Sequence, residues 1–382
     1  MSKAFKTLQD RGFISQMTSE DLLGWEQFHD KPTVYIGFDL TARSLHVGSL
    51  IQLMALRVLV DAGHKVIALV GEATTKVGDP SGKDKSRPML SEAEISNNRA
   101  GITKVIHKLV PEALIVSNGE WFNNSMSFVD FLRDFGAHFT INRMNTFDTV
   151  KRRLENQDPM TFLEYTYMLL QAVDFLKLFE QHGCTVQMGG SDQWGNIVNG
   201  VELVRRVHGD TVFGVTTPLL TDKSGKKMGK TAGGAIWLDA DMTAPFDFFQ
   251  FWRNVEDEKV TEFTKLFVDK SPLPGVDINQ RKEDLAFQVT SLVHGVEVAQ
   301  QCLETAHAVF RNGGVAKEEA ILPGEMLTQV IARLGFAESR SAARRLITGA
   351  AVSVDDVKVS EDITAQPGML LKVGKKKTAR LI

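Results

Sequence analysis

The sequence predicts a protein in three parts: a parallel α/β region, an all-helical region and a small α+β region at the C-terminal end. Three observations lead to this prediction. Short β-type runs alternate with helical runs from about residue 32 to 222, which is the pattern of parallel α/β folds. The β signal then disappears between about 244 and 314. A segment rich in glycine, proline and charge at 312–325 predicts a linker, and short helices and strands follow it.

The α/β region begins with a βαβ unit. TVYIGFD at 33–39 and KVIALVG at 65–71 have the composition of buried strands, and the helical run at 50–63 between them closes with a glycine. Functional loops of such sheets gather at the C-terminal ends of the strands. We therefore expect a site near Asp39, where the first strand ends.

The later elements follow the same reasoning. TVQMGG at 185–190 predicts a strand that runs into a glycine pair, and the segment 194–209 predicts the helix after it. The all-helical part is predicted by three amphipathic runs, at 244–255, 259–269 and 285–310. The last part has short helical runs at 327–336 and 339–349 and strands within 351–356 and 369–382.

The composition of the 382 residues is that of a globular protein, with 43% hydrophobic and 24% charged residues. No apolar run is long enough to span a bilayer, and the N-terminus lacks the apolar segment of a secretory signal. The two cysteines, Cys184 and Cys302, are too few for a metal cage or a disulfide framework. We therefore expect a cytoplasmic protein.

The charge is unevenly distributed. Residues 323–382 contain ten Lys and Arg against six Asp and Glu, a net charge of +4, so the rest of the chain carries −7 of the total of −3. A basic C-terminal domain on an acidic body indicates an anionic partner at that end, although an ordinary solvated surface gives the same count.

The segment HVGS at 46–49 places a histidine and a glycine where a helix begins. Taken alone, it is explained by a core histidine beside a glycine that allows close helix packing. The alternative is a functional loop, since the segment follows the end of the first strand.

A polar stripe crosses the otherwise apolar helix at 165–179. Tyr167, Gln171 and Asp174 are spaced i, i+4, i+7 and therefore share one face. A buried carboxylate needs a partner. The stripe is either an internal hydrogen-bond network or a surface for a small ligand that carries a hydroxyl and an amine.

Two further loops combine glycine with charge. In GDPSGKDKSR at 78–87, Asp79 belongs to a turn, and Lys83 and Arg87 are cations that could bind phosphate. In DKSGKKMGKT at 222–231, Lys227 and Lys230 lie in either an exposed hairpin or a cationic arm over phosphates.

The strand-to-helix connection GGSDQWGN at 189–196 has a similar ambiguity. Gly190 allows a ligand to approach the backbone, and Asp192 is expected in the first turn of the following helix, with Ser191 as its cap. Capping alone explains this pattern. A carboxylate in this place could also accept two hydrogen bonds from a ribose.

Taken in order along the chain, these segments resemble one family. HVGS and KMGKT (227–231) resemble the two signatures of class I aminoacyl-tRNA synthetases. YIGFDLTARSLHVGS, GDPSGK, YTYMLLQAVDF and GGSDQWGN resemble the tyrosyl branch of this family. SRSAARRLITGAAVSV, near the C-terminus, resembles the alpha-L type RNA-binding module. Ser49 departs from the family, in which a second histidine is usual.

The resemblance implies three domains. These are a Rossmann-like catalytic domain at 1–240, a helical anticodon-side domain at 241–320, and an alpha-L type RNA-binding domain at 321–382. It also implies ATP-dependent attachment of tyrosine to tRNA(Tyr), through tyrosyl-adenylate, to the 2′-hydroxyl of the terminal adenosine. The expected partners are L-tyrosine, ATP, tRNA(Tyr) and a second copy of the chain. Mg²⁺ is expected to accompany ATP without a dedicated protein site.

The resemblance also assigns roles to residues. Tyr35 and Asp174 are expected at the phenol hydroxyl of tyrosine. The residues expected at or near its α-amino group are Asp79, Tyr167, Gln171 and Gln193. Those expected to bind ATP are Asp39, His46, Gly48, Ser49, Gly190, Asp192 and Lys230. Those expected around the reacting phosphates are Thr41, His46, Lys83, Arg87, Lys227, Lys230 and Thr231. Those expected to bind RNA are Arg340, Arg344, Arg345, Lys375, Lys376 and Lys377.

Three other functions are compatible with parts of the pattern. A tryptophanyl enzyme shares the fold, but the pair Tyr35 and Asp174 and the basic C-terminal module argue against it. A small nucleotidyltransferase also uses a His-x-Gly element, but it would leave the helical and RNA-binding regions unexplained. A non-enzymatic RNA-binding protein on a synthetase scaffold, such as a splicing cofactor, should have degraded signatures, whereas His46, Lys227 and Lys230 are present.

Overall fold

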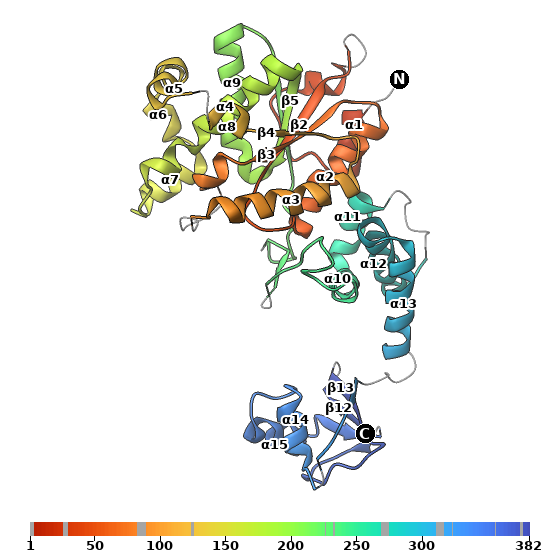
Figure 1. Ribbon diagram of the computed structural model, residues 1–382. Coiled ribbons are helices and arrows are strands. Elements are labelled where there is room, and N and C mark those ends of the chain that lie inside the picture. The colour runs from red at the N-terminus through yellow and green to blue at the C-terminus, as the bar shows by residue number, and fades with distance from the viewer. Residues whose placement is uncertain are drawn as a thin grey trace. The chain divides into compact units, whose positions relative to one another are not determined.

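The structure is a computed structural model, and it describes residues 4–25, 30–81, 89–123, 126–225, 227–231, 234–268, 275–310, 317–322, 324–355, 357–374 and 377–382. The chain divides into two compact units, Met1–Ala299 and Gln300–Ile382, which are described in turn (Figure 1). The division into three domains at 240 and 320 stays a prediction.

The first unit is built on a six-stranded sheet with strand order β1-β6-β5-β2-β3-β4. Its five longer strands run parallel, and the short β1 pairs antiparallel with β6 at one edge. The strands are β1 (Gln16–Met17), β2 (Thr33–Asp39), β3 (Val66–Gly71), β4 (Leu114–Ser117), β5 (Cys184–Gly190) and β6 (Phe213–Thr217). The strand order reverses between β2 and β5, and ligands of open α/β sheets bind beyond the strand ends at this point.

Helices cover both faces of this sheet (Figure 1). The connections β2-α2-β3 and β5-α9-β6 cross the sheet in opposite directions, so right-handed crossovers place α2 and α9 on opposite faces. The helices up to β6 are α1 (Ala4–Arg11), α2 (Val47–Asp61), α3 (Glu92–Leu109), α4 (Gly119–Phe122), α5 (Phe128–Asp134), α6 (Ile141–Met144), α7 (Asp148–Glu155), α8 (Phe162–His182) and α9 (Trp194–His208). Short 3₁₀ turns are η1 (Glu20–Leu23), η3 (Thr74–Lys76), η4 (Gly136–His138) and η5 (Ser191–Gln193).

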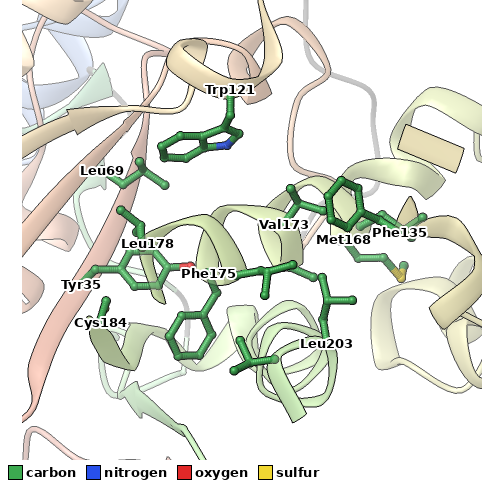
Figure 2. Close-up of a cluster of buried hydrophobic side chains, with 14 of the residues drawn as sticks. Tyr35, Leu69, Trp121, Phe135, Met168, Val173, Phe175, Leu178, Cys184 and Leu203 are labelled. Atoms are coloured by element: carbon green, nitrogen blue, oxygen red, sulfur yellow. The ribbon is translucent and has the colours of Figure 1, made fainter. Parts of the chain in front are cut away.

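A large apolar cluster fills the space between the sheet and α8 (Figure 2). Phe175 on α8 packs against the ring of Tyr35 on β2, with 5.4 Å between ring centroids. Trp121 on α4 and Leu69 on β3 belong to the same cluster. The α8 helix therefore carries its polar stripe on a buried and closely packed element, which fixes the positions of those polar side chains.

After β6 the first unit continues with a hairpin of β7 (Lys230–Thr231) and β8 (Gly234–Ala235) and then with helices. The helices are α10 (Pro245–Arg253), α11 (Asp257–Phe267) and α12 (Ile278–His294). Helix α13 (Val296–Phe310) begins in this unit, and its residues from Gln300 onward belong to the second unit. The predicted helical run 285–310 is divided at Gly295, whose φ of +100° suits glycine. The predicted change from strands to helices near residue 240 is confirmed.

The second unit contains a five-stranded sheet with order β11-β10-β12-β13-β9 and two helices. The strands are β9 (Lys317–Glu319), β10 (Val352–Val354), β11 (Val357–Lys358), β12 (Leu370–Val373) and β13 (Lys377–Leu381). The helices are α14 (Leu327–Arg333) and α15 (Arg340–Thr348). The predicted linker at 312–325 is wrong for 317–319, since β9 pairs parallel with β13. Polar residues of β9 can form a strand because the pairing is supplied by the distant β13.

Candidate active site

His46 lies at the N-terminus of α2, which begins directly after it. Its imidazole Nδ1 accepts a hydrogen bond of 2.9 Å from the backbone N–H of Gly48 and so caps the helix. Because Nδ1 is the acceptor, the neutral ring carries its proton on Nε2, which can act as a donor. A side chain at Gly48 would place a Cβ 2.6 Å from the imidazole Cε1. Glycine is therefore required for this ring position.

The KMGKT segment lies against this helix start. A Cβ built on Gly229 would lie 3.0 Å from Val47 Cγ2 and 3.5 Å from His46 Nδ1. The backbone of Ile236, just beyond the β7–β8 hairpin, accepts from Val47 N–H and donates to the Gly229 carbonyl, both at 2.9 Å. The two signature segments, 180 residues apart, are therefore connected through the backbone.

Asp174 is a buried carboxylate on α8. Its two carboxylate oxygens accept hydrogen bonds from Trp121 Nε1 at 2.9 Å and from Asn118 Nδ2 at 3.1 Å. Burial raises the pKa of Asp174 to about 7, and the nearby charge of Asp39 acts in the same direction, although the two hydrogen bonds oppose the shift.

Tyr35 brings a second polar group to this end of the site from β2. Its side chain is 1% exposed, and its hydroxyl has no hydrogen-bond partner within the described part of the chain. Burial raises the pKa of Tyr35 well above its usual value, with a further contribution from the charge of Asp174. A buried hydroxyl without a partner is costly, so this atom indicates a place for a polar ligand group.

A chain of hydrogen bonds leads from Asp174 to the end of β2. Asn118 Nδ2 also donates to Thr74 Oγ1 at 3.0 Å, and that hydroxyl donates to Asp39 Oδ1 at 2.9 Å. The other oxygen of Asp39 accepts from the hydroxyl of Tyr167 at 3.0 Å. Burial, followed by the charge of Asp39, raises the pKa of Tyr167 well above its usual value, so the hydroxyl remains a donor.

A second network lies on the α9 side. Gln193 Nε2 donates to Asp79 Oδ2 at 2.7 Å. Asn196 Nδ2 lies within hydrogen-bond distance of Gln193 Oε1 (3.1 Å) and Gln171 Oε1 (2.9 Å). It also contacts Ser81 Oγ at 3.2 Å. This network brings together the predicted residues Asp79, Gln171 and Gln193, whose oxygen atoms suit an ammonium group.

The loop after β5 approaches the KMGKT segment. Lys227 Nζ lies 3.0 Å from Asp192 Oδ2. A Cβ on Gly190 would lie 2.7 Å from Asp192 Oδ1, so glycine allows the carboxylate to fold back over the end of β5. The predicted cap at Ser191 is wrong, since a 3₁₀ turn, Ser191–Gln193, precedes α9 and Gln193 precedes its first residue without a side-chain cap. Asp192 lies in this turn and not in α9.

The other predicted residues lie in the loop before α2, in α2 or in β7, or they fall outside the described residues. Thr41 is exposed in the loop between β2 and α2, and Ser49 lies in the first turn of α2. The backbone of Lys230 and Thr231 forms β7. Lys83, Arg87, Lys375 and Lys376 lie outside the described residues.

In the second unit, basic side chains line a groove on α15. The groove is lined by Arg340, Arg344 and Arg345, together with hydroxyl-bearing residues such as Ser341 and Thr348. Arg344 is 71% exposed. Lys377, also predicted at this surface, donates to the carbonyl of Phe336 at 2.9 Å. Exposed arginines beside hydroxyls are suited to phosphate oxygens.

The sequence analysis did not identify the residues that form hydrogen bonds to the predicted site residues. These are Thr74, Ser81, Asn118, Trp121 and Asn196. Asn118 and Trp121 follow the end of β4, a four-residue strand at one edge of the sheet order. The available signal was the change from the apolar run LIV to polar residues, which marks the C-terminal end of a strand.

Comparisons with known proteins agree with this arrangement. The family model of "tRNA synthetases class I (W and Y)" matches residues 26–311, about three quarters of the chain. The chain belongs to this family. The S4 domain model matches residues 327–371 in the second unit.

Relatives of this class I synthetase chain extend over nearly its whole length. A protein of Caulobacter sp. (strain K31) named tyrosine–tRNA ligase is 49% identical, with 93% of this chain and 90% of the relative covered. A tyrosine–tRNA ligase of Xanthobacter autotrophicus is 45% identical, with 98% and 97% covered.

Among solved structures, a C-terminally truncated mitochondrial tyrosyl-tRNA synthetase of Aspergillus nidulans has a TM-score of 0.72 at 32% identity. The match covers 81% of this chain and 95% of that one. The class I synthetase fold predicted from the sequence is therefore confirmed.

In this synthetase chain, no described helix is long and apolar enough to cross a membrane. Nor does the described part contain a group of three or more His, Cys, Asp or Glu that could hold a metal ion.

Proposed function

We propose that this chain attaches tyrosine to tRNA at the expense of ATP, as a tyrosine–tRNA ligase. The relatives named above support the activity over nearly the full chain. The observation that carries the choice of amino acid is the buried pair of Tyr35 on β2 and Asp174 on α8. The hydroxyl of Tyr35 has no partner among the residues that the structure describes, and Asp174 has a buried carboxylate, so a phenol hydroxyl would hydrogen-bond with both.

The same pair explains the rejection of phenylalanine. An amino acid without the hydroxyl would leave the buried polar atoms of Tyr35 and Asp174 without a ligand partner, and this costs binding energy. Tyrosyl enzymes are themselves the standard example of this effect. At the other end of the amino acid, the oxygens of Asp79, Tyr167 and Gln171 are suited to hold the α-ammonium group.

The first step is the attack of the tyrosine carboxylate on the α-phosphate of ATP, which forms tyrosyl-adenylate and releases pyrophosphate. No protein nucleophile is needed, so the chain contributes positioning and charge stabilisation. His46 donates from Nε2 to the phosphate at the positive end of α2. Asp192 binds the ribose, and the KMGKT segment brings Lys227 and Lys230 to the phosphates.

In the second step, the 2′-hydroxyl of the terminal adenosine of tRNA attacks the carbonyl of the adenylate and AMP leaves. Mg²⁺ enters with ATP, held by phosphate oxygens and water. The S4 domain binds the tRNA backbone through the arginines of α15. The proposed location is the cytoplasm, which is supported by two buried cysteines that form no disulfide.

A homodimer is part of the proposal, and exposed apolar side chains on α5 to α8 support it. Phe128 is 63% exposed, Val129 71%, Ile141 68% and Phe162 66%. Exposed apolar side chains gathered on neighbouring elements are typical of subunit interfaces. Sedimentation of the intact chain should give a dimer, and Phe128→Asp should shift it toward the monomer.

The test of the activity is the exchange of pyrophosphate into ATP without tRNA, with tyrosine, phenylalanine or tryptophan offered alone. Exchange with tyrosine only is the expected result. Exchange with tryptophan would keep the family and overturn the roles of Tyr35 and Asp174. No exchange with any of the three, from a chain that still binds RNA, would favour the non-enzymatic scaffold.

A further inference from the structure

Glu72 follows the last residue of β3 and lies beside the turn that carries Asn118 and Trp121. It belongs to none of the segments that resemble the family signatures. Its carboxylate accepts three hydrogen bonds from three other parts of the fold. The donors are Arg99 Nη1 of α3 at 2.8 Å, Ser117 Oγ at the end of β4 at 3.0 Å, and Asn123 Nδ2 after α4 at 3.3 Å.

These contacts hold the turn from both sides. Ser117 precedes Asn118, and Asn123 follows the last residue of α4, the short helix that contains Trp121. The hydroxyl of Ser117, while donating to Glu72, accepts from the N–H of Gly119 at 3.2 Å. A Cβ on Gly119 would lie 3.2 Å from the Glu72 carboxyl carbon, so the carboxylate lies directly against the first residue of α4.

The turn between β4 and α4 also contacts Asp174. Asn118 and Trp121 donate the two hydrogen bonds to its carboxylate. Trp121 lies beside Leu69 in the apolar cluster (Figure 2). Asn118 is fully buried and reaches Thr74 as well, so a displacement of the turn would be passed to both contacts. The geometry of the phenol-binding carboxylate therefore depends on the anchoring of a turn that never touches the ligand.

We propose that Glu72 is a positioning residue for amino-acid recognition, acting through Ser117 and Asn123 on the pair Asn118 and Trp121. It sets the discrimination between tyrosine and phenylalanine without contacting either. The proposal rests on the proposed function, because it concerns the same phenol-binding end of the site.

The test compares Glu72→Ala with the parent in pyrophosphate exchange, with tyrosine and phenylalanine as separate substrates. Loss of the anchor should lower kcat/KM for tyrosine by about tenfold, since small misplacements of positioned groups are costly. The loss should appear as a higher KM for tyrosine, with the KM for ATP unchanged. The kcat/KM for phenylalanine should stay constant, so the ratio of the two values should fall by the same factor.

Three further variants make the outcome decisive. Glu72→Gln keeps an acceptor oxygen at the same reach and should recover most of the ratio. Ser117→Ala is a small change that leaves Glu72 paired with Arg99, and it should lower the ratio as Glu72→Ala does. It replaces Glu72→Ala as the test if Glu72→Ala does not fold. Glu112→Ala removes an exposed partner of Arg57 elsewhere in the same unit and should leave the ratio at the parent value.

An equal loss for both amino acids would show that Glu72 only supports the fold, and an unchanged ratio would show that the anchor is not needed. Either result overturns the inference while tyrosine-dependent exchange by the parent persists. A parent without tyrosine-dependent exchange would instead overturn the proposed function.

Discussion

Lys227 Nζ lies 3.0 Å from Asp192 Oδ2, so the KMGKT segment is joined by an ion pair to the loop that follows β5. Both residues have proposed roles toward ATP, Asp192 at the ribose and Lys227 at the phosphates. Without nucleotide, Lys227 pairs with the carboxylate that we propose for the ribose, so a bound ribose would have to displace the lysine.

This competition predicts an unusual effect of Lys227→Gln. Adenosine has a ribose but no phosphates, so it should bind about two- to fivefold more tightly to the variant, the gain expected from releasing a partly exposed ion pair. ATP should not share this gain, because it loses a cation at its phosphates. Calorimetric titration with each ligand measures both effects, and Lys227→Arg should retain the parent's adenosine affinity. Equal adenosine affinities in parent and Lys227→Gln would contradict the competition.

The pKa of Asp174 predicts a pH dependence of tyrosine binding. With the pKa raised to about 7, the carboxyl is mostly neutral at pH 6 and mostly ionised at pH 8. The ionised form is the better acceptor for a phenol hydroxyl, so the Kd of tyrosine should fall by about tenfold over this range. Equilibrium dialysis measures it. Asp174→Asn should bind tyrosine weakly, with a Kd that does not change with pH. If the Kd of the parent were equally independent of pH, ionisation of Asp174 would have no effect on tyrosine binding.

The ion pair of Arg153 and Glu164 predicts a stability effect at the start of α8. The two side chains, 2% and 5% exposed, are joined at 2.9 Å. Burial would raise the pKa of Glu164, but the hydrogen bonds from Arg153 and Thr161 outweigh it and lower the pKa, so the stabilisation is lost as the pH falls through that lowered pKa.

Glu164→Ala leaves a buried guanidinium without its carboxylate and should cost about 3–5 kcal/mol of the free energy of unfolding at neutral pH. Urea unfolding followed by circular dichroism measures this cost. The matched control is Glu180→Ala on the same helix, which removes a more exposed partner of Lys177 and should cost about 1 kcal/mol or less. A similar loss of free energy of unfolding in the two variants would show that the buried ion pair stabilises the fold no more than the exposed one.

The arginines of α15 predict a separation between the two steps. Replacement of Arg340, Arg344 and Arg345 by Gln should weaken tRNA binding and slow tRNA charging, while pyrophosphate exchange keeps the parent rate. The dependence of log affinity on log salt should become less steep by about one for each arginine that contacts a phosphate. Filter binding at several salt concentrations gives this slope. An unchanged slope would show that these arginines do not contact phosphates of the tRNA.

Elements with strong local patterns could be predicted from the sequence. The strand Thr33–Asp39 has the predicted bounds, because a short apolar run that ends at a polar residue identifies it without outside information. The stripe Tyr167, Gln171 and Asp174 could be placed on one helix face for the same reason. The resemblance then gave these residues roles that no pattern could supply.

What the sequence did not reveal depends on contacts between distant segments. Asn118 and Trp121 contact Asp174 from more than 50 residues away, and no local pattern links them. The strand Lys317–Glu319 forms only because β13 pairs with it about 60 residues later. The prediction of a helix cap at Ser191 was wrong because a 3₁₀ turn precedes α9 there. Local propensity does not distinguish such a turn from the first turn of an α-helix.

The central claim is that Asp174 recognises the phenol hydroxyl of tyrosine, and Asp174→Ala in the pyrophosphate exchange assay tests it most directly. The variant should retain the parent's circular dichroism spectrum, since it removes a carboxylate whose burial is itself unfavourable, and it should lose tyrosine-dependent exchange. A folded variant that activates tyrosine at the parent rate would contradict the claim.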